Sequence, residues 1–225
     1  MPILALLAAA MLAVAAPSPL ETARNQQNRP ALEKLVADAA AAAGKAPNNV
    51  AAQYGAALAS SYLAEVAIEQ RDRKLGRQVA EQGIKFAEKA IALDSNQAEH
   101  YRVLATLYGQ AVTDLFSGLS YGPKAKQAIT TAVSKAPNSS TVYVARGVGN
   151  YYLPAQVGGG TALAIADFRK AIELDPKNAD AWLWLGLALR KENQNAEAQK
   201  AFNRSLQLNP DRVWARQQLE KTPAK

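Results

Sequence analysis

Apolar residues recur at helical spacing along most of this chain, and short polar stops interrupt them. Apolar side chains three and four positions apart share one face of an α-helix. No run of β-branched residues alternates strictly with polar ones, so the pattern predicts an all-α chain without a sheet. The composition agrees, because Ala, Leu, Gln, Glu and Lys are abundant and are good helix formers.

The polar stops divide the chain into units. A proline or polar residue at each stop ends one helix and prepares the next turn. The last two stops are 34 residues apart, and the preceding intervals are 39, 42 and 48 residues. The stops lie at Pro47, Ser95, Pro137, Pro176 and Pro210, and each follows by five places a small residue: Ala42, Ala90, Ala132, Ala171 and Ser205. The pattern therefore predicts about four pairs of helices.

The last unit, residues 179–212, closely resembles one tetratricopeptide repeat (TPR), which is about 34 residues long. The resemblance rests on the spacing of Trp182, Leu185, Gly186, Ala198, Phe202, Ser205 and Pro210. Gly186 and Ala198 are small where two antiparallel helices must approach closely. Trp182, Leu185 and Phe202 supply the bulk that fills the seam between them.

The resemblance extends more weakly over residues 31–212. Tyr101 and Tyr143 stand where Trp182 stands, whereas the first unit has Gln53 at that place. The resemblance implies an α-solenoid of about four TPR-like helix-turn-helix repeats, since one repeat cannot bury its apolar face alone. Residues 213–225 are expected to form a capping helix and tail.

The N-terminal segment has the features of a secretory signal peptide. Ile3–Ala16 is free of charge, and its 14 or so apolar residues are too few to span a bilayer, which needs about 20. We expect residues 1–16 to be removed after Ala15 or Ala16, although no basic residue precedes the apolar run. The alternative is a leader helix that packs on the array. Residues 17–30 are expected to be a linker or a frayed helix.

The sequence contains no recognisable catalytic or metal-binding set. Cysteine is absent, and the single histidine, His100, is expected at the surface. Carboxylates such as Glu65 and Glu69 are most simply interpreted as solvated faces of helices. The net charge of +7 is spread along the chain without a nucleic-acid-binding motif. We therefore expect no enzyme activity, no cofactor, no metal site and no nucleic-acid partner.

The resemblance implies a concave surface lined by the first helix of each pair. The predicted partner-binding groove consists of Tyr54, Leu58, Arg102, Thr106, Val144, Val148, Tyr151, Leu187 and Arg190. The family's known clamp for a terminal carboxylate uses Lys and Asn. This chain has other residues at the corresponding sites, so we do not expect that clamp: they are Tyr54, Arg102, Val144 and Leu183.

These features predict a non-catalytic scaffold that binds another protein or peptide. With the leader, they predict a periplasmic or secreted protein that acts in the cell envelope or periplasm, without stable membrane insertion after leader cleavage. The alternative is a groove-type binder of a small apolar or lipid-like ligand. In that case the Gly-rich inserts at residues 109–126 and 153–161 would partly close the groove.

Overall fold

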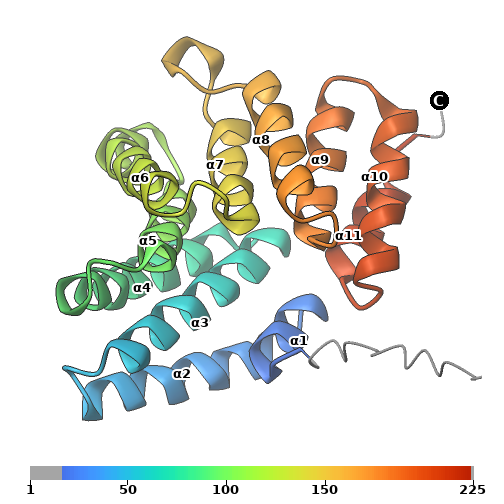
Figure 1. Cartoon of the computed structure of the whole chain (residues 1–225). Helices are drawn as coiled ribbons and strands as arrows, with labels where there is room; N and C mark the ends of the chain where they lie inside the picture. Colours follow the sequence, from blue (N-terminus) through green and yellow to red (C-terminus); the bar gives the residue numbers. More distant parts are fainter. Residues whose placement is uncertain (1–16, 224–225) are drawn as a thin grey trace, which may run out of the picture.

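The computed structural model describes residues 17–223, which fold into α-helices joined by short turns (Figure 1). Between residues 17 and 223 there is no strand, so the all-α prediction is confirmed. The helices are α1 (Pro19–Asn25), α2 (Arg29–Lys45), α3 (Val50–Glu69), α4 (Arg73–Leu93), α5 (Ala98–Gln110), α6 (Leu115–Lys135), α7 (Ser140–Tyr152), α8 (Thr161–Leu174), α9 (Ala179–Lys191), α10 (Asn195–Leu208) and α11 (Val213–Glu220), with a 3-10 turn η1 (Ala155–Val157) before α8.

The helices from α3 to α10 form four consecutive pairs, and the two helices of each pair pack against each other. The first helices also contact one another in order, α3 with α5, α5 with α7 and α7 with α9. Successive pairs therefore stack as in an α-solenoid, as Figure 1 shows. Helix α2 covers α3 at one end, and α11 packs on α10 at the place of the expected capping helix.

The predicted stops coincide with the ends of helices. Helices α2, α4, α6, α8 and α10 end at Lys45, Leu93, Lys135, Leu174 and Leu208, each two residues before its stop. In every case the carbonyl of the small residue accepts a hydrogen bond from the N–H that follows the helix. Four of these small residues are fully buried, which leaves little room for a larger side chain: Ala90, Ala132, Ala171 and Ser205.

The extra residues of the first two repeats lengthen their helices, whereas those of the third repeat lie in the loop at residues 153–160 between α7 and α8. Helices α9 and α10 have 13 and 14 residues, whereas α3 and α4 have 20 and 21. The expectation of a Gly-rich insert at residues 109–126 is wrong for most of that segment, because α6 begins at Leu115. Asp114 and Ser117 form a reciprocal capping box there. This box satisfies backbone N–H groups and offsets the poor helix propensity of the glycines.

Gly186 lies in the closest contact of the last helix pair. A Cβ atom at this position would lie 2.7 Å from Cε1 of Phe202, which is fully buried. The prediction that Gly186 lies in the seam is therefore confirmed. Gly147 takes the same place against Phe168 in the preceding pair.

Apolar side chains form two separate cores. The N-terminal core is built on helices α1 to α6 and includes Leu32, Val66 and Leu107. The C-terminal core is built on helices α7 to α11 and includes Phe168 and Phe202. A polar network joins the two halves and is described below.

Residues 17–30 form an ordered first helix, α1, and the start of α2. Ser18 and Glu21 make a capping box, and Ala23 is buried in the N-terminal core. The predicted signal peptide at residues 1–16 lies outside the described residues. Among residues 17–223, no helix combines the length and apolar character that a bilayer span requires.

Candidate functional site

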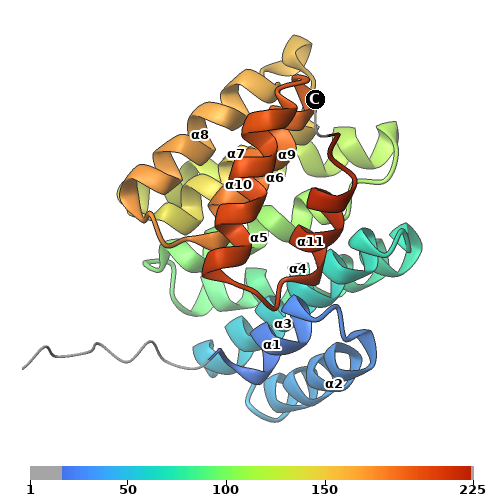
Figure 2. The ribbon, with the colours of Figure 1, turned by 90° about the vertical axis from the view of Figure 1, so that its right-hand side faces the viewer.

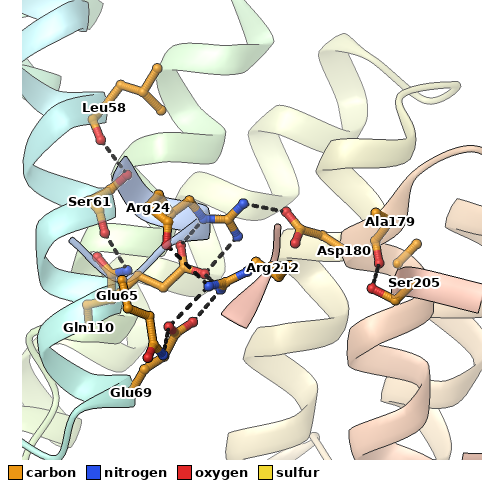
Figure 3. A network of polar contacts seen from close by, with 12 residues as sticks. Arg24, Leu58, Ser61, Glu65, Glu69, Gln110, Ala179, Asp180, Ser205 and Arg212 are labelled. Carbon is orange, nitrogen blue, oxygen red and sulfur yellow. Dashed lines mark hydrogen bonds and ion pairs between the residues drawn. The ribbon is translucent and has the colours of Figure 1, made fainter. Parts of the chain in front are cut away.

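The first and last helices of the described residues, α1 and α11, meet between α3 and α9. Figure 2 shows the turn that precedes α11 next to α1 and α3. Charged side chains from four helices or their caps converge at this point (Figure 3). They are Arg24 of α1, Glu65 and Glu69 near the end of α3, Asp180 in the first turn of α9, and Arg212 at the N-cap of α11.

Arg212 is the central cation of this network and is only 1% exposed. Its Nη1 donates to Oε2 of Glu69 at 3.1 Å, and its Nη2 donates to the other oxygen of the same carboxylate. Nη2 also donates to Oε1 of Glu65 at 2.7 Å. A charged hydrogen bond of this two-pronged kind is stronger and more directional than a single contact. Arg212 therefore ties the C-terminal end of the array to α3.

Arg24 links the same region to α9. Its Nε and Nη2 donate to the two oxygens of Glu65 at 2.8 and 2.7 Å. Its Nη1 donates to Oδ2 of Asp180 at 2.9 Å. The guanidinium also lies over the ring of Tyr62, 5.0 Å from the centroid. One arginine of the first helix thus bridges carboxylates from the first and the last repeat.

Burial sets the electrostatics of the network. It raises the pKa of the Glu69 carboxyl to about 7, although the neighbouring Arg212 acts in the opposite direction. Burial alone would raise the pKa of Asp180, but Arg24 and Arg212 lower it. For Arg24, burial is outweighed by Asp180 and Glu65, which raise the pKa well above its usual value. In total, three carboxyl groups face two guanidinium groups in this network.

Two further contacts surround this network. Nε2 of Gln27 donates to Glu69 at 2.8 Å, and Nε2 of Gln217 donates to Oε1 of Gln27 at 3.1 Å. Not every buried polar atom is satisfied, because Nε of Arg212 and Oε1 of Gln110 have no partner. An unsatisfied buried donor or acceptor costs about 1–3 kcal/mol. The contact between the two ends of the array is therefore rich in ion pairs, although some buried polar atoms around it have no hydrogen-bond partner.

In the N-terminal half, the predicted groove residues mostly contact other residues of the same helices or the N-terminal core. Tyr54 packs on His100, with ring centroids 5.2 Å apart, and Nε of Arg102 donates to Glu99 at 2.7 Å. Thr106 donates its hydroxyl to the carbonyl of Arg102. Leu58 packs against the N-terminal core. His100 is 5% exposed, so its expected surface position is wrong.

In the C-terminal half, the predicted groove residues pack against the apolar core. Leu187 is buried in it, and Val144, Val148 and Tyr151 pack against it from α7. The Tyr151 ring lies 5.8 Å from that of Trp184. The remaining predicted residue is Arg190, whose guanidinium donates to Gln218 and Thr222 at the C-terminal end. Arg190 therefore holds α11 in place.

None of the residues of this charged network is among the predicted groove residues. The interpretation of Glu65 and Glu69 as solvated is wrong for Glu69, whose side chain is 3% exposed, and Glu65 is largely buried. Two carboxylates four residues apart on an apolar helix were the available signal. Their partner Arg212 lies 143 residues away from Glu69, which no local pattern reveals.

A second polar cluster lies at the surface of the N-terminal half. A shallow hollow of about 580 Å³ lies between α4, α5 and α6, where Tyr108 donates to Glu88 and Tyr121 donates to Glu81. Within residues 17–223, His, Asp and Glu side chains form no group of three that could hold a metal ion.

Comparison with known sequences identifies the repeat. Residues 168–200, which run from α8 through α9 into α10, match the family model for the tetratricopeptide repeat. Over 127 residues the chain is 31% identical to human Superkiller complex protein 3. This match covers 56% of this chain and 7% of the human protein. The mouse protein matches equally. The chain thus spans only a small part of these curated relatives.

Solved structures share the fold. A thermophilic TPR protein of Thermus thermophilus superposes with a TM-score of 0.66 at 17% identity, covering 90% of this chain and 96% of that one. The HusA haemophore from Porphyromonas gingivalis superposes with a TM-score of 0.58 at 16% identity, covering 77% and 94%. At these identities the comparison establishes a common arrangement of helix pairs.

Proposed function

We propose that this chain, which carries a tetratricopeptide repeat within a helical array of the TPR fold, is a non-catalytic scaffold that binds another protein or peptide. The observation that carries the proposal is the side-by-side stacking of the first helices α3, α5, α7 and α9. This stacking sets side chains of all four repeats on successive, neighbouring helices. Repeat proteins use such extended surfaces for recognition.

The character of this surface favours a peptide over an apolar ligand. Leu58 and Leu187, which would line an apolar pocket, pack in or against the cores instead. The first helices of the pairs carry charged groups, including Arg102 of α5, which is paired with Glu99, and Asp180 of α9, which is paired with Arg24. A peptide backbone needs such donors and acceptors, whereas a lipid-like ligand needs an apolar cavity. The apolar-ligand alternative therefore has less support.

We place the scaffold in the cell envelope or periplasm. The support is the uncharged segment Ile3–Ala16, followed by Pro17-Ser18-Pro19. A run of this length and composition is typical of a signal peptide. The ordered capping box of α1 begins at Ser18, directly after the proposed cleavage site.

Site-specific photo-crosslinking in the native host tests the proposal. A photoreactive residue replaces Tyr152, which is 63% exposed and lies near Trp184 of α9. Tyr152 is on α7, the first helix of the third pair. The matched control replaces Glu197, which is exposed on the second helix α10. We expect a defined crosslinked protein from position 152 and none from position 197. Equal crosslinking from both positions, or from position 197 alone, would contradict recognition by the first helices.

A further inference from the structure

We propose that Glu65 and Glu69, with Asp180 nearby, form a binding site for an arginine side chain of the partner, and that Arg212 occupies this site from within the chain through its bonds to Glu65 and Glu69. The C-terminal segment then competes with the partner for the same carboxylates. This inference rests on the proposed scaffold function and adds the chemistry of the partner. Figure 3 shows the three carboxylates and the two intramolecular arginines that they hold.

The geometry of the carboxylates selects a guanidinium group. Glu69 receives two N–H groups of Arg212, one on each oxygen. Glu65 receives two N–H groups of Arg24 in the same manner. A planar fork of donors matches a carboxylate in this way, whereas a lysine ammonium presents a single point charge. The site is therefore built to distinguish arginine from lysine.

The charge balance also favours a cationic ligand. The three carboxyl groups come from two helices of the array, α3 and α9, whereas both cations come from the terminal helix α1 and the cap of α11. When Arg212 leaves, Glu69 loses its ion-pair partner and keeps only the amide of Gln27. A buried carboxylate without a cation is costly. An arginine from another molecule would restore the pairing.

Arg212 is the more replaceable of the two arginines. Its Nε is buried and has no partner, whereas Nε of Arg24 donates to Glu65. It caps a helix of 8 residues without a side-chain capping bond and follows the turn at Pro210.

Two side chains of the described residues make the hydrogen bonds that hold the two ends of the array together. Among the described residues, the hydrogen bonds that join α11 and its cap to the N-terminal helices come from Arg212 and Gln217. Within residues 17–223, opening therefore breaks the bonds of these two side chains alone, while α11 stays attached to α9 through Arg190.

Intramolecular competition lowers the apparent affinity for an external arginine. A tethered group acts at an effective concentration in the millimolar range or above. The site is available only in the fraction of molecules in which Arg212 is displaced, and the apparent affinity falls by that fraction. Removing the Arg212 side chain should therefore reveal a site that is largely hidden in the wild type.

The test is calorimetric titration of the full chain with N-acetyl-arginine amide, using N-acetyl-lysine amide as the matched probe. For Arg212→Ala we expect arginine-selective binding at least tenfold tighter than in the wild type. The double variant Arg212→Ala/Glu69→Gln should lose that selectivity, because Glu69 no longer offers two equivalent oxygens. Equal affinity of the wild type and Arg212→Ala, or equal binding of both probes, would overturn the proposal.

A second variant covers the case in which Arg212→Ala does not fold. Gln217→Ala removes the bond to Gln27 and leaves all three carboxylates in place. It should raise the affinity for the arginine probe severalfold, with no gain for the lysine probe. An unchanged affinity would count against displacement of the C-terminal segment.

Crosslinking separates this inference from the proposed function. If position 152 still captures a partner but no variant binds arginine selectively, the scaffold function stands and the arginine site is refuted. If position 152 captures nothing while Arg212→Ala binds the arginine probe, the site stands and the scaffold function is refuted.

Discussion

Arg212 and Glu69 form a two-pronged ion pair across 143 positions of sequence, and both side chains are almost completely shielded from water. This pair joins the N-cap of the last described helix, α11, to the first repeat, so it links the two ends of the array of helix pairs.

Breaking this pair should destabilise the fold. In Arg212→Ala, Glu69 remains buried without its cation, a change that typically costs about 3–5 kcal/mol. Arg169→Ala, at an exposed position on α8, is the control and should stay within about 0.5 kcal/mol of the wild type. Urea unfolding followed by circular dichroism measures both. Equal midpoints for the two variants would show that the pair contributes little to stability.

The stability of the wild type should fall as pH rises through about 7. The pKa of Glu69 is raised to about 7 by burial, against an ordinary value of 4.5. A raised carboxyl pKa means that the folded state binds a proton more tightly than the unfolded state. The resulting stabilisation is present below the unfolded pKa and is lost as pH rises through the folded pKa. Nearby Arg212 and Glu65 act on Glu69 in opposite directions.

Glu69→Gln tests this pH dependence, because glutamine does not titrate. Unfolding free energies at several values between pH 5 and 8 should show a flatter profile for this variant than for the wild type. Asp180 changes the profile only in acid, because its pKa is lowered. Parallel profiles for the two proteins would show that another group controls the dependence.

Adding a methyl group at Gly186 should be destabilising. Its Cβ would meet the Phe202 ring at 2.7 Å, and overpacking of this kind costs about 1–3 kcal/mol. The matched control is Gly149→Ala on α7, where nothing lies within 4 Å of the new Cβ. That change should stabilise the fold by up to about 1 kcal/mol through helix propensity. The melting temperatures of the two variants should therefore shift in opposite directions relative to the wild type. A shift of both in the same direction would contradict a tight contact at Gly186.

Loss of Arg190 should release the last helix. Its guanidinium bonds to the backbone and side chain of Gln218 and to Thr222, and hydrogen bonds of charged groups contribute about 1.5–3 kcal/mol. In Arg190→Ala, amide hydrogen exchange should accelerate in residues 213–222 with little change in α3. Lys191→Ala, in which a neighbouring exposed cation is removed, is the control. Unchanged protection of α11 would mean that other contacts hold it.

The native protein should begin at Ala16 or Pro17. The prediction rests on the uncharged run Ile3–Ala16, which has the length of a signal peptide. Mass spectrometry of the protein purified from its own host measures the N-terminus directly. Recovery of the chain with Met1 intact from a cytosolic fraction would refute export.

The local features of this protein follow from its sequence alone. Stops such as Pro176 and Pro210 end helices because proline cannot continue them, and Gly186 marks the seam because only a small residue fits there. These signals act within one helix or one pair, so the periodicity of the sequence carries them. The sequence accordingly predicts an all-α array and the ends of its helices.

The polar network was decided by the tertiary structure alone. Glu65 and Glu69 stand four residues apart, a spacing that fits a solvated helix face as well as a buried charge pair. Which of these occurs depends on where α1 and α11 lie, and that position results from the packing of four successive helix pairs. Arg212 lies 143 residues from Glu69, so their contact exists only because the stacked repeats bring the two ends of the chain together.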